Sequence, residues 1–406
     1  MNTQLKTTTP ILKTKALLAA LILACSTGFS QTPNILLIIA DDVGVDCFNG
    51  YLNSPILPTT PTLDSLRNSG LTFENAWATP TCTPTRATIM SGKYGIKTGV
   101  LGAPGHLDVS HTSIFKELEI VTSNAYSDAA FGKWHISLPA DPNHPGDHSI
   151  DHYDGILDAG WNGYNDWEHT SAGVTSTNTD YMTTVFTDSA INWINQQSGP
   201  WFTWLAYTAP HSPFHEPPAG MYTINPIGTN FRKYIAMIET LDYEIRRLLN
   251  SLDPAELANT VIFFIGDNGT PKNLVQHYTT GMGKSTLYQG GVHVPMFVCG
   301  DGVTRVGERE NAMVHVNDMY ATILDLNGAN LPGGIYNSLS FNHLLTGSAG
   351  PTKDYNYTEL TQDTTTGYAI RSSQYKLIHH ASGYEEFYDL SIDTFETNNI
   401  IATYQP

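Results

Sequence analysis

The residues from Cys82 to Arg86 combine side chains that could act on an anionic substrate. They read Cys-Thr-Pro-Thr-Arg and run into residues 87–92, a short stretch that predicts a helix. A cysteine at a helix N-terminus meets unpaired backbone N–H groups and the positive end of the helix dipole. Arg86 lies about one turn further on, so it shares the face of Cys82. This combination favours an anion site, although a buried structural cysteine beside a surface arginine fits the same residues.

Two pairs of residues with oxygen-bearing side chains each follow an apolar run that predicts a buried strand. Asp41 and Asp42 end the run 34–40, and Asp267 with Asn268 ends a second run. Carboxylate and amide oxygens are hard ligands, which suit calcium or magnesium better than zinc. Either pair alone could be a turn or a helix cap. Two such pairs at two strand ends favour a metal site.

Lysine and histidine side chains supply further groups for charge stabilisation and proton transfer. Lys133 and His135 are two residues apart, so on an extended backbone they face the same side. His211 lies in a rigid, proline-rich loop, where His215 is equally eligible by composition. Lys284 lies in a glycine-rich loop that could wrap an anion. Each of these also fits a surface lysine or a half-buried histidine.

Apolar runs alternate with helical patterns over most of the chain, which predicts an α/β domain. In such sheets, ligands bind at the carboxyl ends of the strands, where the ionisable residues lie. From residue 355, short alternating runs predict a small antiparallel sheet, with a subdomain boundary near residues 347–351. The apolar runs are 34–40, 129–132, 201–207, 261–266 and 294–298, and the helical patterns are 61–67, 184–196 and 231–252.

The N-terminal residues predict a signal peptide over 1–30. Lys6, Lys13 and Lys15 precede an apolar run, 16–24, that is too short to span a bilayer. Cys25 offers the alternative of a lipoprotein anchor. No later segment is long and apolar enough to cross a membrane, so we expect an exported protein, periplasmic or secreted. The expected parts are a leader, 1–30, a catalytic α/β domain, 31–348, and an antiparallel-sheet subdomain, 349–406.

The net charge and the number of cysteines limit the kinds of ligand and scaffold that this protein can have. The 406 residues carry a formal net charge of −18, which argues against binding to nucleic acid or to anionic membranes. An anionic ligand would therefore need a local positive cluster. Without Cys25, three cysteines remain, and an odd number argues against a disulfide scaffold. We expect Cys47 and Cys299 to be small buried residues, which leaves Cys82 as the special one.

Six motifs, in order along roughly residues 33–300, resemble those of the type I, formylglycine-dependent sulfatases of the alkaline-phosphatase superfamily. The resemblance implies a large mixed sheet sandwiched by helices, with a small C-terminal antiparallel sheet. Residues 317–324 and 387–399 resemble later landmarks of that family. Many members continue beyond the point where this chain ends, which fits either a shortened C-terminal subdomain or a truncated coding sequence. The motifs are Pro33 to Asp42 with Gly44, Cys82 to Arg86 with Gly92, Gly132 to His135, Ala209 to His211, Asp267 to Gly269, and Gly283-Lys284 with Gly290-Gly291.

The resemblance also implies a chemistry, the hydrolysis of a sulfate monoester. A maturation enzyme would convert Cys82 to formylglycine, whose hydrate would bind one Ca²⁺ and attack sulfur. The implied metal ligands are Asp41, Asp42, Cys82, Asp267 and Asn268. The implied catalytic residues are Cys82, Arg86, Lys133, His135, His211 and Lys284.

The family mechanism gives these side chains separate roles. The cations Arg86, Lys133 and Lys284 would neutralise the sulfate. Asp267 would accept the proton of the nucleophile, and His135 would accept a second proton as sulfate leaves. His211 or Lys284 would protonate the leaving alcohol.

The segment 141–170 bears on the substrate. It holds many histidines and aromatic residues that could form sugar subsites, or could pack inward as a structural loop. With export and high acidity, it favours a sulfated polysaccharide or oligosaccharide. The alternatives are an aryl sulfatase, a phosphonate or phosphodiester hydrolase of the same superfamily, and a non-catalytic carbohydrate-binding relative with an unconverted Cys82. The segment contains His144, His148, His152, Trp161, Tyr164, Trp167 and His169.

Overall fold

The first apolar run forms β1 (Asn34–Ala40), a central strand of a ten-stranded sheet in the computed structural model of this chain. The structure describes residues 32–158, 161–362 and 365–404; the expected leader and Cys25 lie outside these residues. All seven residues of β1 are buried, because the strand has neighbours on both edges and helices on both faces. The strand order is β11-β2-β10-β9-β1-β8-β4-β5-β6-β7.

Four central strands run parallel, so their carboxyl ends lie at one edge of the sheet. They are β9 (Thr260–Gly266), β1, β8 (Trp201–Ala206) and β4 (Ser127–Lys133). Ala40 lies opposite Gly266 across β1 and β9, which brings the acidic pairs that follow side by side. A fifth strand, β5 (His152–Ile156), also runs parallel beside β4. The other strands are β2 (Gly70–Phe73), β10 (Met296–Gly300), β11 (Glu308–Glu310), β6 (Trp167–Ser171) and β7 (Val174–Asn178).

The sheet is mixed, as the resemblance implied. β10 pairs antiparallel with both β9 and β2, and β6 pairs antiparallel with β5 and β7. Alternate residues of β1 face two separate hydrophobic cores, one on each side of the sheet.

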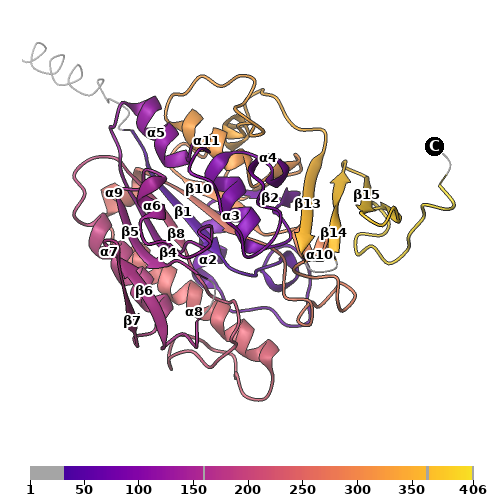
Figure 1. Cartoon of the computed structure of the whole chain (residues 1–406), viewed down its shortest axis with the longest axis horizontal. Coiled ribbons are helices and arrows are strands. Elements are labelled where there is room, and N and C mark those ends of the chain that lie inside the picture. The colour runs from indigo at the N-terminus through magenta and orange to yellow at the C-terminus, as the bar shows by residue number, and fades with distance from the viewer. Residues whose placement is uncertain (1–31, 159–160, 363–364, 405–406) are drawn as a thin grey trace, which may run out of the picture. The chain divides into compact units, whose positions relative to one another are not determined.

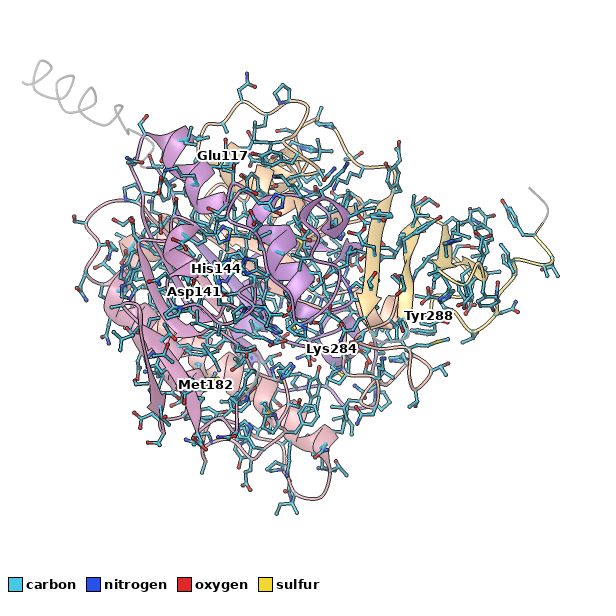
Figure 2. All side chains as sticks on the ribbon, in the orientation of Figure 1. Glu117, Asp141, His144, Met182, Lys284 and Tyr288 are labelled. Carbon is cyan, nitrogen blue, oxygen red and sulfur yellow. The ribbon has the colours of Figure 1, made fainter. Side chains whose placement is uncertain are left out.

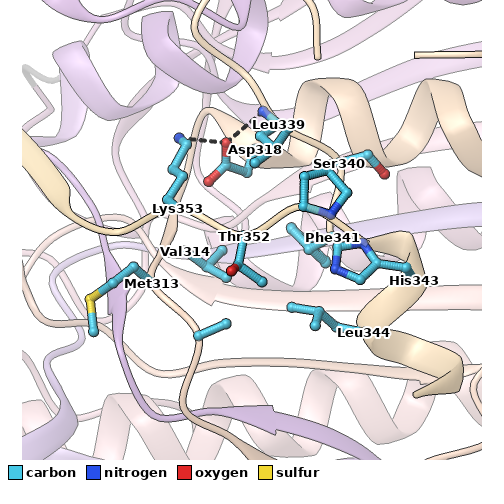
Figure 3. A pocket seen from close by; sticks show the side chains of 12 residues that line it. Met313, Val314, Asp318, Leu339, Ser340, Phe341, His343, Leu344, Thr352 and Lys353 are labelled. Carbon is cyan, nitrogen blue, oxygen red and sulfur yellow. Dashed lines mark hydrogen bonds and ion pairs between the residues drawn. The ribbon is translucent and has the colours of Figure 1, made fainter. Parts of the chain in front are cut away.

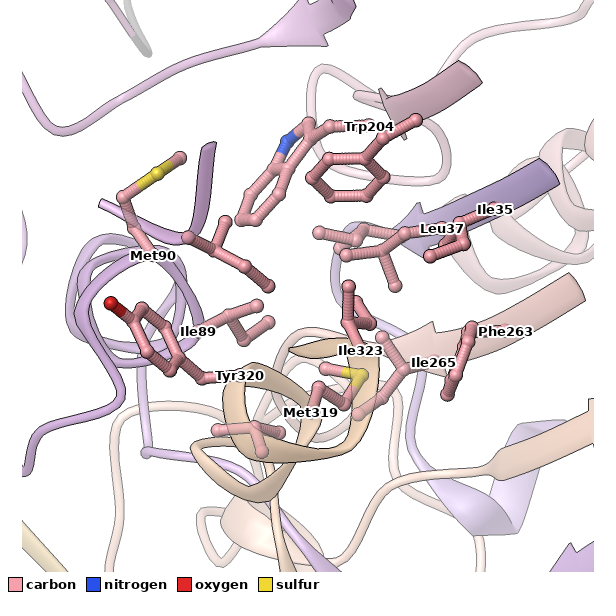
Figure 4. Close-up of a cluster of buried hydrophobic side chains, with 14 of the residues drawn as sticks. Ile35, Leu37, Ile89, Met90, Trp204, Phe263, Ile265, Met319, Tyr320 and Ile323 are labelled. Carbon is pink, nitrogen blue, oxygen red and sulfur yellow. The ribbon is translucent and has the colours of Figure 1, made fainter. Parts of the chain in front are cut away.

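Helices cover both faces of the sheet (Figure 1). On one face, α3 (Cys82–Ser91), α5 (Ile114–Thr122) and α11 (Asp318–Leu326) pack against Ile35 and Leu37 of β1, and Figure 4 shows the contact of α3 and α11 with the strands. On the other face lie α2 (Pro61–Asn68), α7 (Met182–Ile194) and α8 (Asn230–Ser251), which confirm the three helical patterns of the sequence. No helix among the described residues is long and apolar enough to cross a membrane.

The four C-terminal strands form the small antiparallel sheet expected from the sequence. They are β13 (Asn356–Gln362), β14 (Thr365–Arg371), β15 (Tyr375–His380) and β16 (Glu385–Asp389). One face of this sheet shares a hydrophobic core with Trp77, Leu287 and Val292. The shorter elements are η1 (Val45–Cys47), β3 (Ala76–Trp77), α4 (Gly95–Thr98), α6 (His144–Asp147), α9 (Pro254–Ala258), α10 (Gln289–Val292), β12 (Val314–His315) and α12 (Asn342–Thr346).

An ion pair between the buried Asp318 and the partly buried Lys353 holds the connection between α11 and β13. Lys353 Nζ lies 2.6 Å from Asp318 Oδ1, and the Leu339 N–H donates to the same carboxylate at 2.8 Å (Figure 3). Lys353 lies just beyond the predicted subdomain boundary and Asp318 lies before it, so the ion pair spans that boundary, whose position at residues 348–349 stays a prediction.

Ile89→Ala should destabilise the fold because Ile89 is fully buried where α3 packs against the sheet. We expect the free energy of unfolding, measured by urea denaturation, to fall by about 2–5 kcal/mol. The matched control is Ile96→Ala on α4, whose side chain is 64% exposed, and its effect should stay within about 0.5 kcal/mol. Equal losses of unfolding free energy in the two variants would contradict the burial of Ile89 between α3 and the sheet.

Candidate active site

The acidic residues that follow β1 and β9 lie together in a buried cluster. The Asp42 N–H donates to Asp267 Oδ1 at 3.0 Å, and Asn268 Nδ2 donates to Asp42 Oδ1 at 2.8 Å. The Asp267 N–H donates to the Ala40 carbonyl at 2.9 Å. Asp42 has a φ of 68°, a left-handed conformation that aspartate tolerates better than most residues. The side chains of all four predicted metal ligands in this cluster are buried.

Cys82 is the first residue of α3, as its sequence context predicts, and is 2% exposed. Its Sγ lies 3.2 Å from His135 Nδ1, and Thr83 Oγ1 lies 3.2 Å from the same nitrogen. Sγ also lies within 4.8 Å of carboxylate oxygens of Asp41 and Asp267. Burial raises the pKa of the Cys82 thiol, so the thiol is protonated at neutral pH and is a poor nucleophile.

Three cations lie against the acidic cluster and balance its three carboxylates. Each comes from a different part of the chain: α3, the end of β4, and the loop before α10. Arg86 is also fixed by a hydrogen bond from Nη1 to the Lys133 carbonyl at 2.6 Å. Buried carboxylates need such partners, because an unpaired buried charge is strongly destabilising. The ion pairs are Arg86–Asp267 (2.9 Å), Lys133–Asp41 and Lys284–Asp42 (2.5 Å).

Burial and charge shift the pKa values of two carboxyl groups of the cluster in opposite directions. Burial acts to raise the pKa of Asp41, but the positive charges around it, Lys133 above all, hold that pKa well below its usual range. Burial and the charge of Asp41 raise the pKa of Asp267 to about 7. Asp267 is therefore the member of the pair that takes up a proton more readily.

Lys133 and His135 reach the site, but the extended backbone predicted for this pair is wrong. Lys133 is the last residue of β4, whereas His135 has a φ of 58°, in the left-handed region, so the chain turns after the strand. Lys133 nevertheless pairs with Asp41 of the cluster, and His135 reaches Cys82. Burial, together with the charge of Lys133, holds the pKa of His135 well below its usual range. Its imidazole is therefore neutral at neutral pH and can accept a proton.

The two histidines of the proline-rich loop differ in position. His211 Nδ1 lies 2.7 Å from the Ser212 carbonyl, to which it donates, so that Nε2 is left facing Asp42 at 4.0 Å. His215 instead packs on Tyr164, with ring centroids 4.3 Å apart. The structure thus brings His211, and not His215, to the cluster.

Four of the seven histidines and aromatic residues singled out in the segment 141–170 are buried, as in the structural alternative for this segment. Trp161 is only partly buried, and its ring lies 5.7 Å from Lys133 Nζ and 5.2 Å from the ring of His211. Thr83 is a site contact that the sequence analysis missed, although its place beside Cys82 could have indicated it. The buried members of the segment are His144, which Figure 2 labels, His148, Tyr164 and Trp167.

The oxygen atoms of the cluster fit a hard divalent cation. Within the part of the chain that the structure describes, Asp41 Oδ1 and Asn268 Oδ1 are buried and accept no hydrogen bond. Leaving a buried acceptor unpaired is unfavourable, and a bound cation would satisfy both oxygens. Two sets of residues bring potential ligand atoms within 4.8 Å of one another: Asp41, Asp42 and His211, and Asp41, Cys82 and Asp267.

Comparison with known families identifies the family and the fold of this chain. Residues 33–329, which include every predicted site residue, match the family model described as Sulfatase. This chain belongs to the sulfatase family. Residues 281–405 also match a model described as N-sulphoglucosamine sulphohydrolase, C-terminal. The family match confirms the predicted recognition and the predicted fold class.

Individual sulfatases are similar over most of this chain. Arylsulfatase J of Mus musculus is 30% identical over 329 residues, which cover 75% of this chain and 54% of the relative. N-acetylgalactosamine-6-sulfatase of Sus scrofa is 27% identical over 346 residues, covering 75% and 64%. The solved structure of Ps i-CgsB in complex with k-i-k-neocarrahexaose has 26% identity and a TM-score of 0.76, covering 92% of this chain and 89% of that one. The chain thus spans less than two thirds of the two curated relatives.

Arg86→Ala should destabilise this sulfatase because it leaves the buried carboxylate of Asp267 without its ion pair. We expect the free energy of unfolding to fall by about 3–5 kcal/mol, measured by guanidinium denaturation. The matched control is Arg309→Ala, which removes a 42% exposed arginine paired with Glu74 and should cost at most about 1 kcal/mol. A loss for Arg86→Ala no larger than that of the control would contradict the buried pairing.

Proposed function

We propose that this protein hydrolyses a sulfate monoester on a carbohydrate, using formylglycine made from Cys82 and one bound Ca²⁺. The observation that carries the proposal is the convergence of Arg86, Lys133 and Lys284 on the acidic cluster around Cys82, within a sulfatase-family fold. A sulfate ester is an anion that resists nucleophiles until its charge is neutralised, so it requires such a cluster of cations.

The donor atoms of the cluster support calcium as the ion. The carbonyl oxygen of Asn268 and one oxygen of Asp41 are free to bind it, together with Asp42, Asp267 and the side chain at position 82. The ion would add positive charge for the sulfate and, with the hydrated aldehyde, provide an oxygen nucleophile. The buried, protonated thiol of Cys82 is itself unsuited to that task, which supports its conversion by a maturation enzyme.

The positively charged side chains would bind and orient the sulfate group. Arg86 is held by its bonds to Asp267 and to the Lys133 carbonyl, so its guanidinium is already in place before substrate arrives. Lys133 and Lys284 pair with carboxylates in the same cluster. Donors fixed in advance stabilise a developing charge without having to reorganise during the reaction.

Proton transfers can be assigned to the remaining groups. Asp267, with its raised pKa, would accept the proton of the nucleophile at position 82. Neutral His135, whose Nδ1 lies 3.2 Å from the Cys82 sulfur, would accept the second proton as sulfate leaves. The leaving alcohol would be protonated from the side of His211 and Lys284, both of which lie beside Asp42.

A carbohydrate substrate is supported by the relatives and by one aromatic ring. One relative is named for N-acetylgalactosamine 6-sulfate chemistry, and Ps i-CgsB is described with a bound neocarrahexaose. Trp161 lies beside Lys133 and His211, where an indole ring could stack on a sugar. An aryl sulfate is the second candidate, because another relative is named as an arylsulfatase. Export by the leader 1–30 and the domain limits 31–348 and 349–406 remain part of the proposal.

Hydrolysis of a panel of sulfated saccharides, aryl sulfates, phosphodiesters and phosphonates tests the function, measured as released sulfate for the sulfate esters and as released alcohol for the phosphorus esters. The protein is produced with a maturation enzyme, and mass spectrometry of the peptide that contains Cys82 verifies the aldehyde. Lys133→Ala should lower kcat/KM for the best sulfate ester by at least about 100-fold, the scale of losing one preorganised charge. The control is Lys97→Ala, an exposed lysine on α4. Turnover of phosphorus esters alone, or an intact thiol in active protein, would overturn the proposal.

Calcium should stabilise the folded protein, because it binds ligands that only the folded chain brings together. At a concentration 100-fold above its dissociation constant, Ca²⁺ should raise the free energy of unfolding by about 2.7 kcal/mol. Asp41→Asn should remove most of this gain, measured by thermal unfolding with calcium and with a chelator. Asp166→Asn, which changes an exposed aspartate, should keep the gain. The same gain in both variants would show that calcium binds elsewhere.

A further inference from the structure

A turn near the C-terminus holds the segment that carries Lys284 at points on both sides of that lysine. We call residues 393–399 the C-terminal turn and residues 276–292 the Lys284 segment. Phe395 of the turn stacks on His277, with ring centroids 5.2 Å apart, and meets Tyr278 edge-on at 5.5 Å. Glu396 Oε2 accepts a hydrogen bond from the Gln289 N–H at 2.5 Å. The turn therefore contacts the segment both before and after Lys284.

Glu396 occupies an unfavourable environment for a carboxylate. It is 1% exposed, and its backbone has a φ of 58°. Its Oε1 lies 2.5 Å from Lys376 Nζ of β15, and both side chains are fully buried. Lys376 Nζ lies 5.1 Å from the ring of Trp77, whose Nε1 donates to the Gln289 side chain at 2.8 Å. Burial lowers the pKa of Lys376 to about 8 and raises that of Glu396.

These features indicate that Glu396 fixes the position of neighbouring groups rather than stabilising the fold. A buried ion pair contributes little net stability compared with apolar residues of the same volume. A left-handed backbone at a residue other than glycine costs on the order of 1–3 kcal/mol. What the arrangement does supply is a fixed acceptor for the Gln289 N–H, at the start of α10.

The Lys284 segment is tied to the active site through its backbone. A Cβ on Gly269, the residue after Asn268, would lie 1.8 Å from the Gly290 carbonyl oxygen. The two backbone segments are therefore in direct contact, with no side chain between them. A shift of α10 would therefore move the loop that holds Asp267 and Asn268. The connecting hydrogen bonds run from Gly269 N to Gly291 O (2.9 Å), Lys284 N to Thr270 O (2.8 Å) and Ser285 N to Pro80 O (2.7 Å).

The opposite end of the Lys284 segment has a separate anchor. Asp46 of η1 accepts hydrogen bonds from the Gln276 N–H at 2.8 Å and from Thr270 Oγ1 at 2.6 Å. This anchor holds the beginning of the segment to the chain that follows Asp42. The part after Lys284 is the part that Glu396 holds.

We propose that Glu396 is a positioning residue that sets the location of Lys284 relative to Asp42 and Cys82. It acts through the Gln289 N–H and touches no reacting atom. The proposal rests on the proposed function, in which Lys284 binds the sulfate group. It gives the small C-terminal sheet, which supplies Lys376, a direct part in the geometry of the active site.

A double-mutant cycle with Lys284 tests the proposal. Glu396→Gln keeps the shape of the side chain but leaves one acceptor oxygen in place of two, so it cannot accept from both Lys376 and the Gln289 N–H. In the otherwise wild-type holoenzyme it should lower kcat/KM for a sulfate ester by about 10-fold, whereas in the Lys284→Ala background it should change kcat/KM by less than about 2-fold. Hydrogen exchange of residues 281–292 should become faster. The matched control, Glu385→Gln, changes a 43% exposed glutamate of β16 paired with His379 and should leave both readouts unchanged.

The outcomes separate this inference from the proposed function. Equal losses of kcat/KM in both backgrounds, or unchanged exchange in residues 281–292, would overturn the positioning role. If Glu396→Gln does not fold, the double variant Glu396→Met/Lys376→Met leaves no unpaired charge, removes the acceptor of the Gln289 N–H and takes its place in the cycle. If the wild-type protein hydrolyses no sulfate ester, the proposed function fails, and the exchange measurement still tests whether Glu396 holds the segment.

Discussion

Like charges at the carboxyl ends of neighbouring parallel strands are the constraint on which this structure depends. Parallel pairing of β1 and β9 places Asp41 and Asp267 side by side, and their burial leaves no water to screen them. Such carboxylates can stay together only if positive charge surrounds them or if one takes up a proton. Both responses occur here: Lys133 and Arg86 pair with the two carboxylates, and the pKa of Asp267 is raised. The same charges that permit the cluster also make it suited to an anion.

Local sequence signals were sufficient for the elements and for most of the site. The apolar runs of β1 and β9 and the helical period of α8 predicted these elements within a residue or two, because burial on two faces or on one stripe determines residue type directly. Polar residues after parallel strands also had to meet, since the strand ends lie at one edge. Cys82 at the start of α3 followed from its own neighbours.

The remaining features depend on contacts that no local pattern encodes. His135 turns into a left-handed conformation, so its approach to Cys82 could not follow from the spacing to Lys133. Within 141–170, composition alone could not separate Trp161 from rings that pack inward. Glu396 and Gln289 are 107 residues apart, and their contact appears only when the small sheet packs against α10. That sheet shares its core with Leu287 and Val292, so it packs against the segment that carries Lys284.

The burial of Cys82 limits the time at which another enzyme could oxidise it. Its sulfur lies at the start of a buried helix, next to His135, and the residue is 2% exposed. Another enzyme could not surround this side chain with its own active site unless α3 and the neighbouring strand ends were still apart. Under the proposed function, the oxidation of Cys82 must therefore happen on a chain that is still folding. Synthesis, oxidation of Cys82 and folding would then have to occur in that order, and a molecule that folds before Cys82 is oxidised would stay inactive.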